Sequence, residues 1–203
     1  MRIPRLLKDY RDAGAVNTLL SLWGFVDDET FITKSGHVGV VYALRGADAE
    51  GQTHGQRRML THRFEAALRL LDERCRVYQY VIKRVAPPFA AAPCTQPVAN
   101  EAIQRRVSYL NGRLDALSQV ELFMVLLLEA PIAGSGRSRR HGLRAWLSAA
   151  ERLSVVEGEI ECAVAELHHK AGGFEVQLAD LGIRRLPKSD AFRFFRQLLN
   201  YEP

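Results

Sequence analysis

The sequence has few cysteines, no long apolar run and no secretory leader, and each shortage argues against a class of protein. Its three cysteines, Cys75, Cys94 and Cys162, are odd in number, far apart and in no CxxC pair, which argues against both a disulfide scaffold and a zinc site. The longest apolar run, residues 122–128, is much shorter than the roughly 18 residues that a membrane-spanning helix needs. The N-terminal residues have no continuous apolar segment of the kind found in a signal peptide. We therefore expect a cytoplasmic chain with reduced thiols.

Motifs that hold phosphates, metals or catalytic nucleophiles are also missing. The phosphate-binding pattern GxxxxGK[ST] does not occur, and its nearest candidate, residues 134–138, lacks the Lys-Ser/Thr pair. His168 and His169 are neighbours that point in different directions on a helix, while His54 and His62 have no carboxylate or cysteine at ligand spacing. No GxSxG elbow appears, and no cysteine lies in a nucleophile signature. We therefore predict no catalytic, cofactor-binding or metal-binding residue.

The chain is basic, and its charges are segregated. Its 28 lysines and arginines exceed its 23 acids, which gives a net charge of +5. Residues 57–84 carry eight bases against three acids and residues 184–196 five against one, whereas residues 151–175 carry six acids against two bases. Such polarity suits docking to an oppositely charged partner, although solvated helix faces produce similar blocks. The candidate partner-binding residues are all arginines: Arg57, Arg58, Arg137, Arg139, Arg140, Arg184 and Arg185.

Hydrophobic periodicity predicts a sheet with helices between its strands. Two β-rich runs, residues 25–33 and 37–46, flank a turn at Gly36, where glycine supplies the positive φ of a hairpin. Apolar residues recurring at three and four predict an amphipathic helix over residues 53–73. The β-branched and aromatic run over residues 75–85 predicts a third strand.

The second half of the chain is predicted to be richer in helix. A proline-rich loop over residues 86–97 precedes a helix with one apolar face between Ile103 and Leu117. The continuous apolar run over residues 120–130 predicts a central strand that is buried on both faces. A long helical pattern over residues 143–167 follows, and we expect Gly172–Gly173 to end it.

These elements predict an α+β fold, with a four-stranded, mainly antiparallel sheet of ferredoxin-like flavour and packed helices. Two strand-helix-strand units build the sheet domain, which we place at residues 1–135 with an N-terminal strap at residues 15–24. Residues 136–203 are predicted to form a mostly helical lobe. Its last helix is capped by Ser189-Asp190.

Several short motifs, taken together, resemble one family. They are Trp23–Asp28 before the first strand, the Lys34-Ser35-Gly36 turn, the strand end Arg45–Asp48, the later Glu129-Ala130-Pro131, and the closing segment 182–203. The pattern resembles the N-terminal domain of the CagE/TrbE/VirB family of type IV secretion ATPases. Each motif is a short pattern of residue types, and together the motifs cover nearly the whole chain.

The resemblance implies a non-catalytic assembly domain that contacts inner-membrane subunits and other copies of the ATPase, in conjugal transfer or effector secretion. It implies a peripheral position at the cytoplasmic face of the inner membrane. Family members continue into a RecA-like motor with Walker motifs, and we expect these 203 residues to lack that motor, to hydrolyse no ATP and to need no cofactor. The arginine clusters leave open a basic nucleic-acid-binding module of a conjugation system. That alternative ranks second, because the sequence has no aromatic-basic interleaving of the RNP kind.

Overall fold

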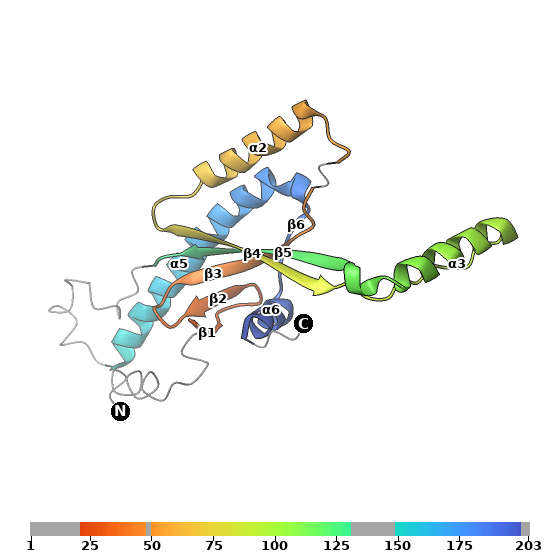
Figure 1. Cartoon of the computed structure of the whole chain (residues 1–203). Helices are drawn as coiled ribbons and strands as arrows, with labels where there is room; N and C mark the ends of the chain where they lie inside the picture. The colour runs from red at the N-terminus through yellow and green to blue at the C-terminus, as the bar shows by residue number, and fades with distance from the viewer. Residues whose placement is uncertain (1–20, 48–49, 131–148, 200–203) are drawn as a thin grey trace. The chain divides into compact units, whose positions relative to one another are not determined.

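The fold is built on a sheet that carries helices on both faces (Figure 1). The computed structural model describes residues 21–47, 50–130 and 149–199. Five strands follow the order β1-β2-β3-β5-β4, and β6 pairs with β3. The strands are β1 (Leu22–Phe25), β2 (Thr30–Thr33), β3 (Val38–Leu44), β4 (Cys75–Val85), β5 (Ser118–Leu128) and β6 (Ile183–Arg185). The α+β prediction is confirmed, and β2 to β5 are its four strands.

Four helices and two short 3₁₀ turns complete the described fold. The helices are α2 (His54–Arg69), α3 (Pro97–Asn111), α5 (Ala149–Gln177) and α6 (Lys188–Leu199), and the turns are η2 (Leu114–Ala116) and η3 (Ala179–Leu181). Internal contacts divide the described chain into two compact units. Unit 1 runs up to Gln79 and resumes at Phe123, and unit 2 is Tyr80–Leu122. The boundary at residue 135 stays a prediction; β6, which follows it, pairs with β3 of the sheet.

The predicted hairpin is formed by β2 and β3. The two strands are antiparallel, with Phe31 opposite Gly39, and Gly36 takes the positive φ of 85° that the turn requires. Gly39 has a second role in packing. A Cβ at this position would lie 2.5 Å from Cζ of Phe31 and 3.0 Å from the carbonyl oxygen of Leu126. The missing side chain therefore makes room for the Phe31 ring.

One of the two predicted strand-helix-strand units is a crossover between separated strands. β3 and β4 are joined by α2 and have β5 between them, whereas β4 and β5 are neighbours. Backbone hydrogen bonds mark the two ends of the β4–β5 ladder, from Glu129 N–H to the Arg74 oxygen at 2.8 Å and from Ala86 N–H to the Leu117 oxygen at 3.2 Å. β4 and β5 therefore form a hairpin, and the segment that contains α3 is its long connection.

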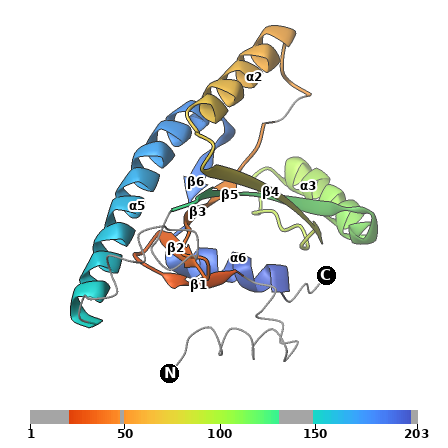
Figure 2. The ribbon, with the colours of Figure 1, turned by 90° about the vertical axis from the view of Figure 1, so that its left-hand side faces the viewer.

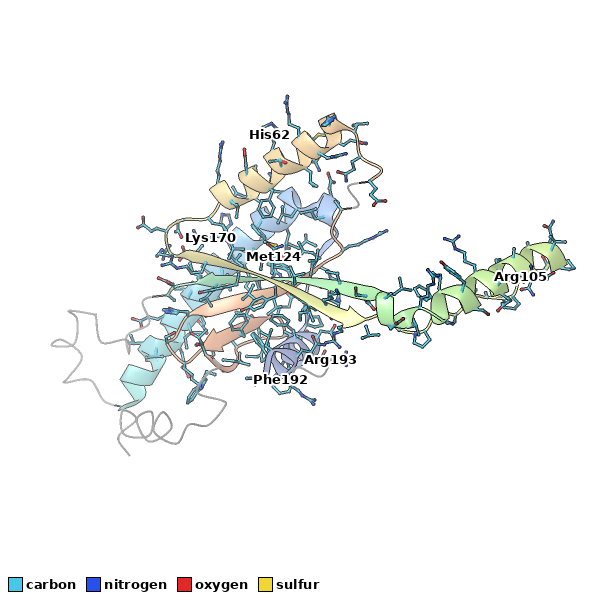
Figure 3. The ribbon with its side chains drawn as sticks, viewed as in Figure 1. His62, Arg105, Met124, Lys170, Phe192 and Arg193 are labelled. Carbon is cyan, nitrogen blue, oxygen red and sulfur yellow. The ribbon has the colours of Figure 1, made fainter. Side chains whose placement is uncertain are left out.

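The main core lies between the sheet and α5. β3 and β5 each turn alternate residues to this face, as their period of two requires. The ring of Tyr42 lies 6.0 Å from that of Phe174 on α5, and Met124 lies in this layer in Figure 3. Buried members of the cluster come from both layers: Val38, Val40, Tyr42, Ala67, Met124, Leu126, Leu128, Ala163, Leu167, Ala171, Phe174 and Leu178. α2 contributes one buried residue, Ala67.

α6 covers the opposite face of the sheet from α2, as Figures 1 and 2 show. Its Phe195 ring meets Phe31 edge to face at 5.2 Å, and its Phe194 ring lies 4.8 Å from Phe123. These residues alternate with those of the main core along β2 and β5. The sheet is therefore buried on both faces at its centre, as predicted for the apolar run that became β5.

α5 runs past the glycine pair that was expected to end it. The helix continues through Gly172–Gly173 to Gln177, so that prediction was wrong. The buried residues Ala171, Phe174 and Leu178 keep the helical spacing and hold the helix on the sheet. Gly173 also brings α5 close to the end of α2, since a Cβ there would lie 3.1 Å from Cδ1 of Leu70.

In unit 2, α3 is the predicted second helix, and its residues are less buried than a helix packed on a sheet requires, contrary to the prediction. None of its residues is buried, and its apolar stripe, Ile103, Val107 and Leu110, is half-buried. The loop before α3 is tied to its C-terminal end by the Asn111 side chain. This amide accepts a hydrogen bond from Phe89 N–H at 2.8 Å and donates one to the Phe89 oxygen at 3.0 Å.

Candidate partner-binding site

The predicted residues Arg57 and Arg58 lie on the first turns of α2, which begins at a capping box. The Thr53 hydroxyl accepts from Gln56 N–H at 3.3 Å, and the Gln56 side chain accepts from Thr53 N–H at 2.8 Å. This arrangement satisfies two N–H groups that a helix start leaves unpaired. Because Phe64 and Ala67 face the core, the register of the helix leaves both arginines exposed.

The charges of α2 are only partly neutralised. Its Arg63 forms an ion pair with Asp180 of η3, and His62 Nδ1 lies 3.6 Å from Glu65. Arg57 donates to the Gln52 carbonyl at 3.2 Å. Arg58 has no ion-pair partner within the described ranges. α2 therefore presents a net positive surface.

A shallow depression of about 430 Å³ runs along one side of α2. Small and apolar residues of α2 lie among its basic ones, and Figure 3 shows His62 on the side of the helix away from the sheet. The lining residues are Gly55, Arg58, Met59, His62, Arg63, Ala66 and Gln177. An acidic group on a partly apolar segment suits such a surface, because carboxylates pair with arginine while the apolar part covers Met59.

Arg184 and Arg185, also predicted as partner-binding, are adjacent on β6 and have different environments. Arg184 is 63% exposed and lies 3.8 Å from Asp190. Arg185 is only 14% exposed, with its guanidinium 2.6 Å from Glu175 and 2.9 Å from Glu29. Burial alone would lower the pKa of Arg185, but the hydrogen bond to Glu175 and the neighbouring charges raise it. Little of Arg185 is left for a partner.

Arg185 belongs to a polar cluster between the sheet and α5 that no sequence pattern indicates. It lies 2.9 Å from Nδ1 of His168, whose Nε2 lies 3.0 Å from the Thr30 hydroxyl. The Tyr42 hydroxyl is buried beside it and makes no hydrogen bond of good geometry to a described residue. Burial, and then the charge of Glu175, raise the pKa of Tyr42 far above its usual range. Each acidic side chain of the cluster lies beside a basic one. The cluster therefore links the sheet to α5 and has a structural role.

A second ion network joins the end of α2 to α5. Asp72 accepts from Lys170 at 2.9 Å and from Arg74 at 3.1 Å, and Arg74 also pairs with Glu166. The Lys170 hydrogen bond is the main reason that the pKa of Asp72 is far below its usual value. Burial, followed by the Asp72 contact, raises the pKa of the Cys75 thiol. A raised pKa lowers the fraction of Cys75 that is present as the reactive thiolate at neutral pH.

Unit 2 exposes large apolar side chains on both of its structural elements. On α3, Val98 is 83% exposed and Tyr109 is also exposed. They lie eleven residues apart, on the face opposite the half-buried stripe, so this helix is apolar on two sides. The β4–β5 ribbon adds Val81, Val85 and Val120, all exposed. Exposed large apolar side chains that gather on one part of a chain are typical of protein-protein contacts.

The remaining predicted site residues, Arg137, Arg139 and Arg140, lie outside the described residues. Among those that the structure describes, no three His, Cys, Asp or Glu side chains converge as metal ligands. No described helix is long and apolar enough to cross a membrane. Cys75, Cys94 and Cys162 are free cysteines.

Comparison with known proteins gives one family. Residues 29–136, more than half of the chain, match the family model described as type IV secretion system ATPase VirB4/TrbE, N-terminal domain. The match extends from the start of the β2–β3 hairpin past the end of β5. No curated protein matches the chain.

Proposed function

Because this chain belongs to the family of the type IV secretion system ATPase VirB4/TrbE, N-terminal domain, we propose that it is a non-catalytic assembly domain. It docks the ATPase onto inner-membrane subunits of the secretion complex and onto other copies of itself. It acts at the cytoplasmic face of the inner membrane, in conjugal transfer or effector secretion. The matched family model describes the N-terminal domain and not the catalytic ATPase domain.

The observation that carries this proposal is the surface of unit 2. A 15-residue helix without a buried residue gains little from burial in its own chain, since most helical stability in proteins comes from packing an apolar face. The exposed side chains of Val98 and Tyr109 on α3 offer that burial to another protein. Valine and tyrosine are suited to the buried centre of an interface, from which charged residues are depleted.

The charged clusters of unit 1 support a structural and not a catalytic role. Arg185 and His168 are engaged with neighbouring side chains, as are Lys170 and Asp72. Catalytic groups instead tend to converge on a pocket with a free nucleophile, acid or base. The described depression beside α2 is lined by basic and apolar residues, glycine and the amide of Gln177, and by no carboxylate. We therefore assign no hydrolysis and no cofactor to this chain.

Binding to isolated subunits tests the proposal. The purified 203-residue chain is immobilised and exposed to detergent-solubilised inner-membrane subunits of a type IV secretion complex, each in turn, with an unrelated basic domain of similar size as control. We expect at least one subunit to be retained by the chain and not by the control. Retention of none of them would overturn the docking proposal.

The exposed arginines of α2 keep nucleic acid as the second candidate partner. Arg57 and Arg58 could contact phosphates, and affinity would then fall steeply with salt as counterions are released. However, the one aromatic residue of α2, Phe64, faces the core and cannot stack on a base. We expect no retention of single- or double-stranded DNA at physiological salt. Tight DNA binding whose affinity falls steeply with salt concentration would favour this second function.

A further inference from the structure

The outer side of α2 carries positive charge that the described residues of unit 1 leave uncompensated. Arg58 and Arg69 are exposed, and neither forms an ion pair with a described residue. Glu65, the single acid of the helix, faces His62. The depression beside Arg58 adds exposed apolar surface from Met59. A basic rim around a partly apolar floor is thus open to an acidic partner.

The N-terminal half of α5 presents the opposite charge. Glu157 and Glu161 are exposed one turn apart, and neither has a partner among the described side chains. Beside them one face of the helix carries only short side chains, because Gly158, Cys162 and Ala165 recur at spacings of four and three. A Cβ added to Gly158 would meet no atom within 4 Å. Small residues allow a second helix to approach closely.

These two surfaces lie at opposite ends of the same helical layer. α2 packs on the C-terminal half of α5, where Leu70 contacts Gly173. In Figures 1 and 2 the N-terminal half of α5 continues away from α2. At 1.5 Å per residue, Glu157 is about 24 Å along the helix from Gly173. A molecule therefore cannot place its own α2 on its own acidic surface, whereas a second copy can.

We propose that α2 of one copy docks on the N-terminal half of α5 of a second copy, with Arg57 and Arg58 opposite Glu157 and Glu161. This rests on the proposed function, for which it names one partner and the surfaces that meet. Met59 packs over the small residues of α5, and the charges set partner choice and association rate. The contact joins two different surfaces, so repetition gives a ring if the rotation closes and a filament if it does not.

Charge exchange between the two surfaces provides the test. One variant carries Arg57→Glu and Arg58→Glu, and the other carries Glu157→Lys and Glu161→Lys. Sedimentation velocity of the purified chain over a concentration series, at low and high salt, measures association. We expect wild type to self-associate and each variant alone to weaken association at least about tenfold, because like charges then meet. An equimolar mixture of the two variants is expected to restore it, since opposite charges meet at every contact.

A matched control reverses two arginines on another helix. Arg193→Glu with Arg196→Glu on α6 changes the same amount of charge and is expected to leave association unchanged; Figure 3 shows Arg193 on the outer side of α6. Urea midpoints of all variants check folding. A wild-type chain that stays monomeric, or a mixture that stays as weak as its components, would overturn this interface. Retention of membrane subunits would still stand in that case, so the two proposals fail separately.

Discussion

The Arg185 guanidinium donates a hydrogen bond to Nδ1 of His168 at 2.9 Å and thereby fixes which nitrogen carries the imidazole hydrogen. A guanidinium only donates, so Nδ1 must accept, and the hydrogen is on Nε2. Nε2 lies 3.0 Å from the Thr30 hydroxyl and 3.4 Å from the Asp27 carboxylate. Through its two ring nitrogens, His168 of α5 therefore connects β6 and the start of β2.

Loss of Arg185 is expected to destabilise unit 1. Arg185→Ala removes the partner of Glu175, Glu29 and His168 at once, and uncompensated polar groups in a largely buried site cost about 2–3 kcal/mol in unfolding free energy. Arg184→Ala is the matched control: the Arg184 side chain is itself 63% exposed, so its loss should cost about 0.5 kcal/mol or less. Urea unfolding measures both. Equal midpoints for the two variants would contradict the internal role of Arg185.

Asp27 is expected to make stability depend on acid pH. Burial acts to raise its pKa, but hydrogen bonds from the N–H groups of Glu29 and Thr30 and contacts with Thr30 and His168 lower it overall. A carboxylate with a lowered folded pKa stabilises the protein above its unfolded value of about 3.9, and this contribution disappears as the pH falls through the folded pKa. Its stabilisation is therefore fully present at neutral pH.

The Asp27→Asn variant tests this dependence. At pH 7 we expect it to be less stable than wild type by about 1 kcal/mol, because the N–H groups of Glu29 and Thr30 then donate to a neutral amide and not to a carboxylate. The difference should shrink as the pH falls below the unfolded pKa of about 3.9 and through the lower folded pKa, because wild-type Asp27 then becomes neutral as well. Asp28→Asn, an exposed neighbour, is the control and should match wild type at pH 7. A difference that grows toward low pH would show that the sign is wrong.

Gly39 is expected to tolerate no side chain. Gly39→Ala would place Cβ 2.5 Å from the Phe31 ring, which is held by Phe195 on its far side, and overpacking of this kind costs about 2–3 kcal/mol. Gly24→Ala is the control, because a Cβ there meets nothing within 4 Å. Thermal unfolding compares the two. If Phe31 is the obstacle, adding Phe31→Leu to Gly39→Ala should cost less than the sum of the single changes.

Much of the sheet could be predicted because its signals are local. β4 has the predicted bounds, Cys75–Val85, since its β-branched residues end at a proline-rich loop. The Gly36 turn and the continuous apolar run of β5 were equally local. Gly172–Gly173 misled the prediction because helix ends were judged from propensity, while the buried Phe174 and Leu178 outweigh two glycines.

The candidate site shows that sequence patterns cannot separate exposed arginines from arginines that are paired inside the fold. Arg57 and Arg58 were predicted from charge density, and their exposure depends on the register of α2. Arg184 and Arg185 belong to one basic block, yet neighbouring strand residues face opposite sides, and the partners of Arg185 decide its role. The Thr30–His168 contact joins residues 138 positions apart. Nothing in a single sequence indicates such a pair.

Substitution of the exposed apolar residues of α3 tests the docking role most directly. The measurement is the dissociation constant of the 203-residue chain for an inner-membrane subunit that it retains, for wild type, Val98→Ser with Tyr109→Ser, and Gln104→Ala as an exposed control on the same helix. We expect the double variant to bind at least about tenfold more weakly, while its urea midpoint and the binding of the control stay at wild-type values. Undiminished binding by the double variant would contradict the account.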